Sequence, residues 1–175
     1  RPGQLSFGSS GNATAAHLAS ALLLFRTGLD MVHVPYRGGA PALQDLVAGN
    51  IAFVFGTVAS SLRLAQEGRV RAIAVSSATR LAALPDVGTV AEQGLPGYEL
   101  NEWNGLYGPA GMTPALGARW HGAVRHALAD AAVRARLEAL GAMPVGSEPA
   151  DFARYVASER ARMAALVREA RVTIE

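Results

Sequence analysis

Short hydroxyl side chains and glycines lie together in one loop near the start of the chain. Ser9, Ser10 and Thr14 share this loop with Gly8 and Gly11. An apolar run precedes the loop and an apolar helical pattern follows it, which predicts a strand, a turn and a helix. The first turn of such a helix has unpaired N–H groups and a partial positive charge. The loop is therefore a candidate site for an anion such as a carboxylate or phosphate.

Two other interpretations of this loop stay open on the pattern alone. A Ser/Gly/Asn turn with Thr14 near the first helical turn is also what a plain strand-to-helix connection needs for capping. A serine hydrolase would use Ser9 or Ser10 with His17 or His33, although no spacing here requires such a triad. No Gly-Lys-Ser/Thr follows, which excludes a Walker loop. The sequence also has no paired acidic motif for glycoside hydrolysis and no ligand cluster for metal catalysis, so we predict that the protein is not an enzyme.

Apolar runs alternate with helical patterns through the first half of the chain. The expected strands are Gln4–Phe7, Met31–Val34, Ile51–Phe55 and Val70–Val75. The expected helices are Ala13–Thr27, Pro41–Ala48 and a segment from Gly56-Thr57 to Glu67. This alternation predicts right-handed βαβ units and a mainly parallel sheet, so the fold class is α/β.

Ligands of open parallel sheets bind beyond the carboxyl ends of the strands. This rule selects three loops, Ser9–Thr14, Tyr36–Gly39 and Gly56-Thr57. Hydroxyl groups and backbone N–H groups of the first loop would bind a carboxylate. Thr57 suits a helix cap equally well, and Tyr36 is better explained as a packed aromatic. The candidate ligand-binding residues are Ser9, Ser10, Gly11, Asn12, Ala13, Thr14, Tyr36, Gly38, Thr57 and Trp103.

The composition changes near Trp103, where strands give way to helical patterns. Tyr98–Tyr107 alternates polar and apolar residues and predicts an extended segment. The elements expected elsewhere are a short helix from Thr89 to Gln93, helices Ala115–Ala129 and Ala132–Leu140, a short strand Met143–Val145, and a last helix from Pro149 to about Ala170.

Charge, cysteine and histidine usage exclude several function classes. The net charge is +2 and the arginines are scattered, so nucleic-acid binding has little support. The chain has no cysteine. His121 and His126 are five residues apart on one expected helix, which does not place them on one face for a metal. Structural roles are expected for His17, with a hydrogen bond to a neighbouring loop, and for His33.

Several ordered motifs together resemble one protein family. They are Gly8-Ser9-Ser10-Gly11-Asn12-Ala13-Thr14 with His17-Leu18, His33-Val34-Pro35-Tyr36-Arg37-Gly38-Gly39, Arg71-Ala72-Ile73-Ala74-Val75, Leu84-Pro85-Asp86-Val87, Ala91-Glu92-Gln93-Gly94-Leu95-Pro96-Gly97, Trp103-Asn104-Gly105-Leu106 and Gly108-Pro109-Ala110-Gly111. This set resembles Bug-type (TctC-like) receptors, the solute-binding proteins of tripartite tricarboxylate transporters. Ala13 replaces the usual glycine of that signature, and Met112 lengthens a later loop.

The resemblance implies a lobe of the type II periplasmic-binding-protein fold, with a mainly parallel sheet flanked by helices, plus a C-terminal helical segment. Residues 1–102 would form the second, ligand-binding lobe. Residues 103–175 would form a crossover and the helices that return to the first lobe. The chain would then be a C-terminal fragment lacking most of the first lobe, and its uncovered apolar face would favour a homodimer.

The resemblance also implies a function. A periplasmic receptor of this family captures a small carboxylate-bearing solute between two lobes and delivers it to membrane transporter subunits, with no cofactor or metal. An alternative is a receptor that signals to a sensor kinase. A serine hydrolase that uses the Gly8–Gly11 loop is the remaining alternative.

Overall fold

The computed structural model describes residues 2–170 and 172. The chain forms two compact units. The first unit contains Arg1–Glu102 and Ala164–Glu175, and the second contains Trp103–Met163.

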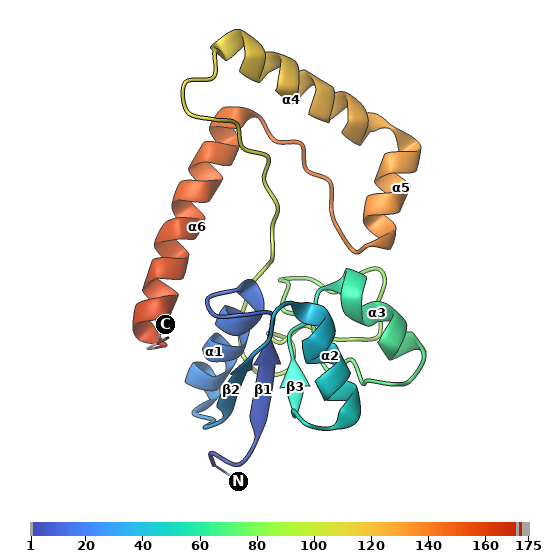
Figure 1. Ribbon diagram of the computed structural model, residues 1–175, viewed down its shortest axis with the longest axis vertical. Helices are drawn as coiled ribbons and strands as arrows, with labels where there is room; N and C mark the ends of the chain where they lie inside the picture. The colour runs from blue at the N-terminus through green and yellow to red at the C-terminus, as the bar shows by residue number, and fades with distance from the viewer. Residues whose placement is uncertain (1, 171, 173–175) are drawn as a thin grey trace. The chain divides into compact units, whose positions relative to one another are not determined.

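The first unit is built on a three-stranded parallel sheet (Figure 1). Its strands are β1 (Ser6–Ser9), β2 (Val32–Pro35) and β3 (Phe53–Val54), in the order β2-β1-β3. In the register of the sheet, Phe7 of the central strand pairs with His33 on one side and with Phe53 on the other. The α/β class and the parallel sheet predicted from the sequence are confirmed.

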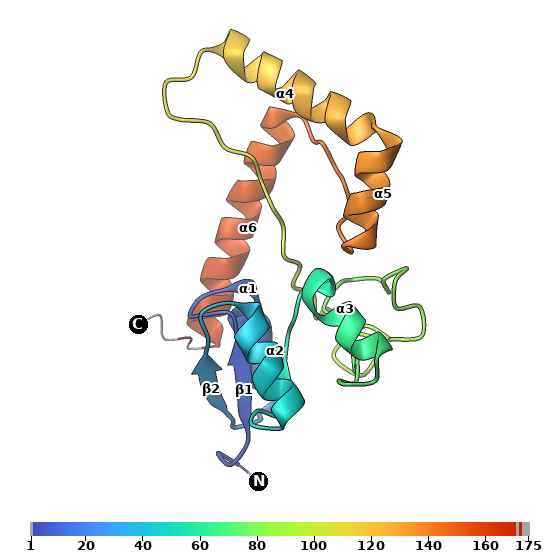
Figure 2. The ribbon, with the colours of Figure 1, turned by 45° about the vertical axis from the view of Figure 1, so that its right-hand side comes forward.

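Three helices follow the three strands. They are α1 (Ala15–Thr27), α2 (Gly39–Ala48) and α3 (Val58–Gln66). The chain moves from β1 to β2 in one direction and from β2 past β1 to β3 in the other. Right-handed crossovers in opposite directions place α1 and α2 on opposite faces of the sheet, as Figure 2 shows. Gly28 and Gly49 end α1 and α2 in the left-handed conformation, as helix C-caps commonly do.

The core of this unit forms where the central strand meets its helices. Phe7 is 3% exposed and stacks on Phe53, with ring centroids 5.5 Å apart. Tyr98 is also buried, and its hydroxyl donates to the Ala19 carbonyl oxygen at 2.7 Å. This bond ties the extended chain around residue 98 to the middle of α1.

The predicted strand Val70–Val75 does not form. Only Val75 makes a β-bridge, and its partner is Thr89 rather than the sheet. The carbonyl oxygen of Ile73 accepts a hydrogen bond from the Gln93 side chain at 2.8 Å. The backbone of this segment is therefore paired with a later loop, which the apolar run could not reveal. The predicted strand Met143–Val145 is also wrong, because this segment is extended but unpaired and both of its ends are more than four-fifths exposed.

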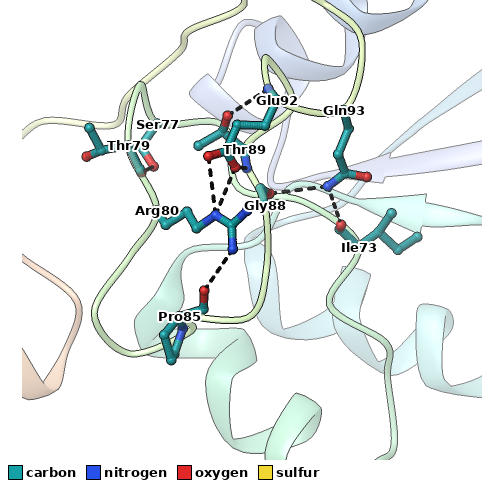
Figure 3. Close-up of polar contacts among 9 residues, drawn as sticks. All are labelled: Ile73, Ser77, Thr79, Arg80, Pro85, Gly88, Thr89, Glu92 and Gln93. Carbon is teal, nitrogen blue, oxygen red and sulfur yellow. Dashed lines mark hydrogen bonds and ion pairs between the residues drawn. The ribbon is translucent and has the colours of Figure 1, made fainter.

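The later loop is one helical turn instead of the predicted short helix. Thr89 and Glu92 close a capping box, in which Glu92 N donates to Thr89 Oγ1 at 3.0 Å and Thr89 N donates to Glu92 Oε2 at 2.8 Å. Figure 3 shows Arg80 joining this turn, with its guanidinium bonded to Glu92 and to the Pro85 carbonyl oxygen. Hydrogen bonding to the Thr89 N–H and to Arg80 lowers the pKa of the Glu92 carboxyl.

The second unit contains helices and extended chain. Its helices are α4 (Pro114–Ala129), α5 (Ala131–Ala139) and most of α6 (Pro149–Glu169), whose residues from 164 onward belong to the first unit. Thr113 caps α4 through Leu116 N, and Asp130 caps α5. None of the described residues from 103 to 163 is buried. No helix among the described residues is long and apolar enough to cross a membrane.

Candidate ligand-binding site

Three helices begin at the same edge of the sheet. Because β1, β2 and β3 are parallel, their carboxyl ends meet there, and α1, α2 and α3 start just beyond them (Figure 1). No acidic residue lies in the first turn of any of these three fully described helices. The partial positive charges of the helix starts are therefore not neutralised locally, and this edge favours an anion.

Backbone hydrogen bonds join two of the three predicted loops. Tyr36 N donates to the Ser9 carbonyl oxygen at 3.0 Å, and Gly38 N donates to the Ser10 carbonyl oxygen at 3.3 Å. Gly38 has φ of 111° as the N-cap of α2, a conformation that favours glycine. The α2 N-cap provides no side-chain hydrogen bond, so the first N–H groups of α2 depend on other partners.

The Ser9 side chain points into the protein. It is fully buried, and its Oγ lies 2.7 Å from His33 Nε2. The same Oγ accepts from Gly11 N at 3.2 Å and contacts the Gly11 carbonyl oxygen at 3.0 Å. The hydroxyl is thus engaged by Gly11 and His33 inside the protein. Ser10, next to it, is only half-buried.

Ala13 and Thr14 are also bonded within the loop. Ala13 N donates to His17 Nδ1 at 3.1 Å, and Ala13 has φ of 58°, which costs a non-glycine residue about 1 kcal/mol or more. Thr14 is the N-cap of α1, where its Oγ1 donates to the Gly11 carbonyl oxygen at 2.8 Å and accepts from His17 N at 3.4 Å. The capping interpretation of Thr14 therefore holds.

His17 and His33 form a stacked pair beneath the loop. Their ring centroids are 3.8 Å apart with an interplanar angle of 13°, and Phe7 stacks on His33 at 4.9 Å. Burial, and then the charge of His17, lower the pKa of His33 to about 4. Burial also lowers the pKa of His17. The sequence predicted structural roles for both histidines but gave no sign that their rings touch.

Tyr36 is held by α2. Its hydroxyl donates to Asp45 Oδ2 at 2.6 Å, and this hydrogen bond is the main cause that raises the pKa of Tyr36 to about 12. Asn50 donates to the other oxygen of the same carboxylate at 3.1 Å. Asp45 was not predicted, because only the fold brings it to Tyr36.

The remaining predicted residues lie in different places. Thr57 is the N-cap of α3, where its Oγ1 lies 2.9 Å from Ser60 Oγ and its carbonyl oxygen accepts from Ser60 and Ser61. Trp103 belongs to the second unit, where its ring makes edge contacts with Phe152 and Tyr155. The other candidates, Gly11 and Asn12 included, are in the first unit. No group of three or more His, Asp or Glu residues suited to a metal occurs among the described residues.

Solved periplasmic binding proteins share this architecture. The R. palustris protein Rpa4515 with adipate matches with a TM-score of 0.93 at 32% identity, covering 99% of this chain and 58% of that one. MatC from Rhodopseudomonas palustris with bound malate has a TM-score of 0.85 at 32% identity, covering 94% of this chain and 57% of that one. The periplasmic binding protein BugD has a TM-score of 0.90 at 28% identity over 98% of this chain and 58% of its own. The fold is thus that of a periplasmic binding protein.

The family follows from the sequence match. The family described as tripartite tricarboxylate transporter family receptor (TctC) matches residues 1–172, and the chain belongs to this family. A UPF0065 protein in the tcbD-tcbE intergenic region of a Pseudomonas species is 40% identical over 98% of this chain and 51% of its own length. The chain spans about half the length of the curated relatives it matches. The resemblance to Bug-type receptors is confirmed.

Proposed function

We propose that this chain supplies the ligand-binding lobe of a periplasmic receptor that captures a small carboxylate for a tripartite transporter. The observation that carries this proposal is the meeting of three helix starts at one sheet edge, with no acidic residue in their first turns. Rpa4515 and MatC, with adipate and malate, support a carboxylate as the ligand.

Residues of the site divide into those that contact the ligand and those that hold the loop. Ser10 and the N–H groups at the starts of α2 and α3 are proposed to bind one carboxylate, with Gly38 leaving room for close approach. Gly11, Asn12, Thr14 and Thr57 complete this edge. Ser9, Ala13 and Tyr36 hold the loops, since their polar groups are engaged inside the protein.

The rest of the receptor would close the cleft from the other side. The second unit, which begins at Trp103, is proposed to return to the receptor's other lobe, which would cover apolar side chains such as Trp120 and Leu116. Within the predicted segment 103–175, the residues from 164 onward lie in the first unit. In the absence of that lobe, a second copy of the chain would cover them and form a homodimer. Analytical ultracentrifugation of the 175-residue chain distinguishes a monomer from this dimer.

The contact between Ser9 and His33 is the observation that favours a hydrolase. Three features argue against that alternative. The Ser9 side chain is fully buried, so a substrate does not reach it. The pKa of His33, lowered to about 4, makes it a weak base near neutral pH. No acidic side chain is bonded to His33 among the described residues. We therefore propose a binding protein without enzymatic activity.

Calorimetric titration with acetate, adipate, malate and citrate tests the proposal. It is performed on this chain and, where the gene encodes more residues, on the whole gene product. Ser10→Asp places a negative charge at the site, and we expect it to weaken binding at least about tenfold. Ser10→Asn is the control, because it has nearly the same size without the charge. Equal affinities of these two variants, or no binding of any carboxylate, would refute the carboxylate site.

A captured ligand is either delivered to a transporter or sensed by a signalling partner, and these two functions are tested separately. Uptake of the labelled ligand by cells that lack the gene, compared with complemented cells, decides between them. Lost uptake supports delivery to a transporter. Normal uptake together with a lost transcriptional response supports signalling to a sensor kinase.

A further inference from the structure

The hydrogen bond between Ala13 and His17 depends on the protonation state of the imidazole. Ala13 N–H is the donor and His17 Nδ1 is the acceptor, at 3.1 Å. A ring nitrogen accepts only through a free lone pair, so His17 must be neutral and carry its proton on Nε2. Protonation of Nδ1 would place two N–H groups against each other and break this bond.

This bond holds the loop in a conformation that Ala13 does not prefer. Ala13 is the only non-glycine residue with positive φ among the described residues. Nearby, Gly11 is anchored by Ser9 Oγ, and Ser9 is bonded to His33. The two stacked imidazoles therefore hold both ends of the Ser9–Thr14 loop, His33 at its start and His17 near its end.

No charged partner stabilises a protonated form of this pair among the described residues. β1 has no ionisable side chain, and β2 has only His33. Besides His17, α1 has Arg26, whose guanidinium donates to the Pro96 carbonyl oxygen at 2.8 Å. An open hollow of about 460 Å³ beside the rings is lined by apolar residues that include Phe25, Leu29 and Met31, together with Ala170 and Val172. In α6, Arg168 and Glu169 directly precede Ala170. The Tyr98 hydroxyl, which is also ionisable, donates to the Ala19 carbonyl oxygen of α1.

We propose that His17 is a positioning residue for the carboxylate-binding loop, and that its protonation releases Ala13 and lowers carboxylate affinity as the pH falls. This inference rests on the proposed function, because it concerns the same loop. Simple charge attraction predicts the opposite sign, since a protonated histidine near an anion would strengthen binding. The sign of the pH dependence therefore separates loop positioning from direct attraction.

The direction of the pH effect follows from the environment of the pair. Burial disfavours the charged form of each ring, and a charge on one ring disfavours a charge on the other. Both rings are then neutral at neutral pH, and the loop is held. Acidification below the usual histidine range protonates the pair and frees the loop.

The test is calorimetric titration with adipate between about pH 7.5 and about pH 4, a range that extends below the usual histidine range to the lowered pKa of His33. His17→Leu removes the acceptor, and we expect its affinity at neutral pH to fall about fivefold to tenfold, the value of one hydrogen bond. His17→Asn retains an acceptor near the position of Nδ1 but does not titrate. We expect it to bind like wild type at neutral pH and to lose less affinity than wild type on acidification.

Matched controls isolate His17 from other groups that titrate. Protonation of adipate itself affects all variants equally, so only the difference between wild type and His17→Asn counts. His126→Asn removes a histidine from the second unit, and we expect it to follow wild type at every pH. Tighter wild-type binding at acid pH, or the same pH profile for His17→Asn as for wild type, overturns the proposal.

A ligand-free measurement keeps this proposal separate from the proposed function. Nitrogen-15 NMR of the chain reports the tautomer of His17, and the Ala13 amide resonance reports the loop. We expect the Nε2–H tautomer at neutral pH and an Ala13 amide shift that follows the titration of His17. An Nδ1–H tautomer of His17, or an Ala13 amide shift that does not change during that titration, refutes the positioning role. If no variant binds a carboxylate, the proposed function fails, and the NMR result still decides whether His17 positions the loop.

Ala13→Gly provides an independent check of the mechanism. Glycine adopts positive φ without strain, so the loop should need His17 less. We expect His17→Leu to weaken adipate binding by a smaller factor in the Ala13→Gly background than in wild type. Equal factors in both backgrounds would mean that His17 acts by packing alone, which contradicts the proposal.

Discussion

The two compact units contain large apolar side chains, but only the first buries them. Phe7 of the first unit is 3% exposed, whereas Trp120 of the second is 56% exposed. The buried polar groups, Ser9, His17, Ser20 and Thr89, also belong to the first unit. No buried polar side-chain atom among the described residues lacks a hydrogen-bond partner.

The difference shows what a parallel sheet contributes to folding. Pairing of β1 with β2 and β3 brings three distant segments together, and helices then cover both faces of the sheet. Helices α4 and α5 have no buried residue, because amphipathic helices need an opposing layer to complete a core. Apolar composition is therefore necessary for a core but does not create one.

The largest expected difference in stability between the two units appears when one aromatic ring is removed from each. Phe7→Ala should lower the free energy of unfolding by about 3–5 kcal/mol, because it leaves a cavity between the sheet and α1. Trp120→Ala removes a larger ring but should cost less than about 1 kcal/mol, since that ring is more than half exposed. Urea denaturation followed by circular dichroism measures both. Comparable losses would mean that the second unit has a core of its own.

Acid should destabilise the first unit through its histidine pair. The pKa of His33 is lowered from 6.5 to about 4 in the folded protein, so the unfolded chain takes up the proton first. Stability is therefore highest above pH 6.5 and falls as the pH decreases towards about 4. Carboxyl groups with lowered pKa, such as Asp45 and Glu92, add their losses at still lower pH.

His33→Gln isolates this contribution. Its side-chain amide reaches the position of Nε2 near Ser9 but does not titrate, so the loss between pH 6.5 and about 4 should shrink. Urea midpoints across that range give the comparison, and His126→Asn in the second unit should match wild type. An unchanged acid loss in His33→Gln would remove the histidine explanation.

A smaller difference in stability is expected when one tyrosine hydroxyl is removed from each unit. Tyr98→Phe should cost about 1–2 kcal/mol, because the buried Ala19 carbonyl oxygen loses its 2.7 Å hydrogen bond. Tyr107→Phe in the second unit should change stability by less than about 0.5 kcal/mol, since Tyr107 is 63% exposed. Thermal melting of both variants makes the comparison, and it fails if the Tyr107 variant is the less stable one.

The smallest difference in stability between the units is expected for the threonine N-caps, because both units have one. Thr14 caps α1 and Thr113 caps α4, each through a backbone N–H three residues later. Thr14→Ala and Thr113→Ala should each cost about 1 kcal/mol, with Thr14 the larger because its hydroxyl also donates to Gly11. Circular dichroism at increasing urea detects both losses. No loss for Thr113→Ala would mean that capping matters only beside a core.

Much of the fold could be predicted because its signals are local. Gly28 after an apolar helix, Thr113-Pro114 before another, and the alternation of strands with helices each indicate an element directly. The prediction of a strand at Val70–Val75 was wrong, because an apolar run does not indicate which backbone segment it will pair with. The Thr89–Glu92 capping box and Gln93, far along the chain, decided that pairing.

By itself, the sequence determined the α/β class, the helix caps and the family, because propensity, turn residues and motifs act over short distances. The candidate loop could also be located, since Ser9–Thr14 follows the first strand. Only the tertiary structure decided which groups of that loop remain available to a ligand. The Ser9 hydroxyl and the Ala13 N–H are taken by His33 and His17, and these hydrogen bonds exist because the parallel sheet and α1 bring the two imidazoles beneath the loop.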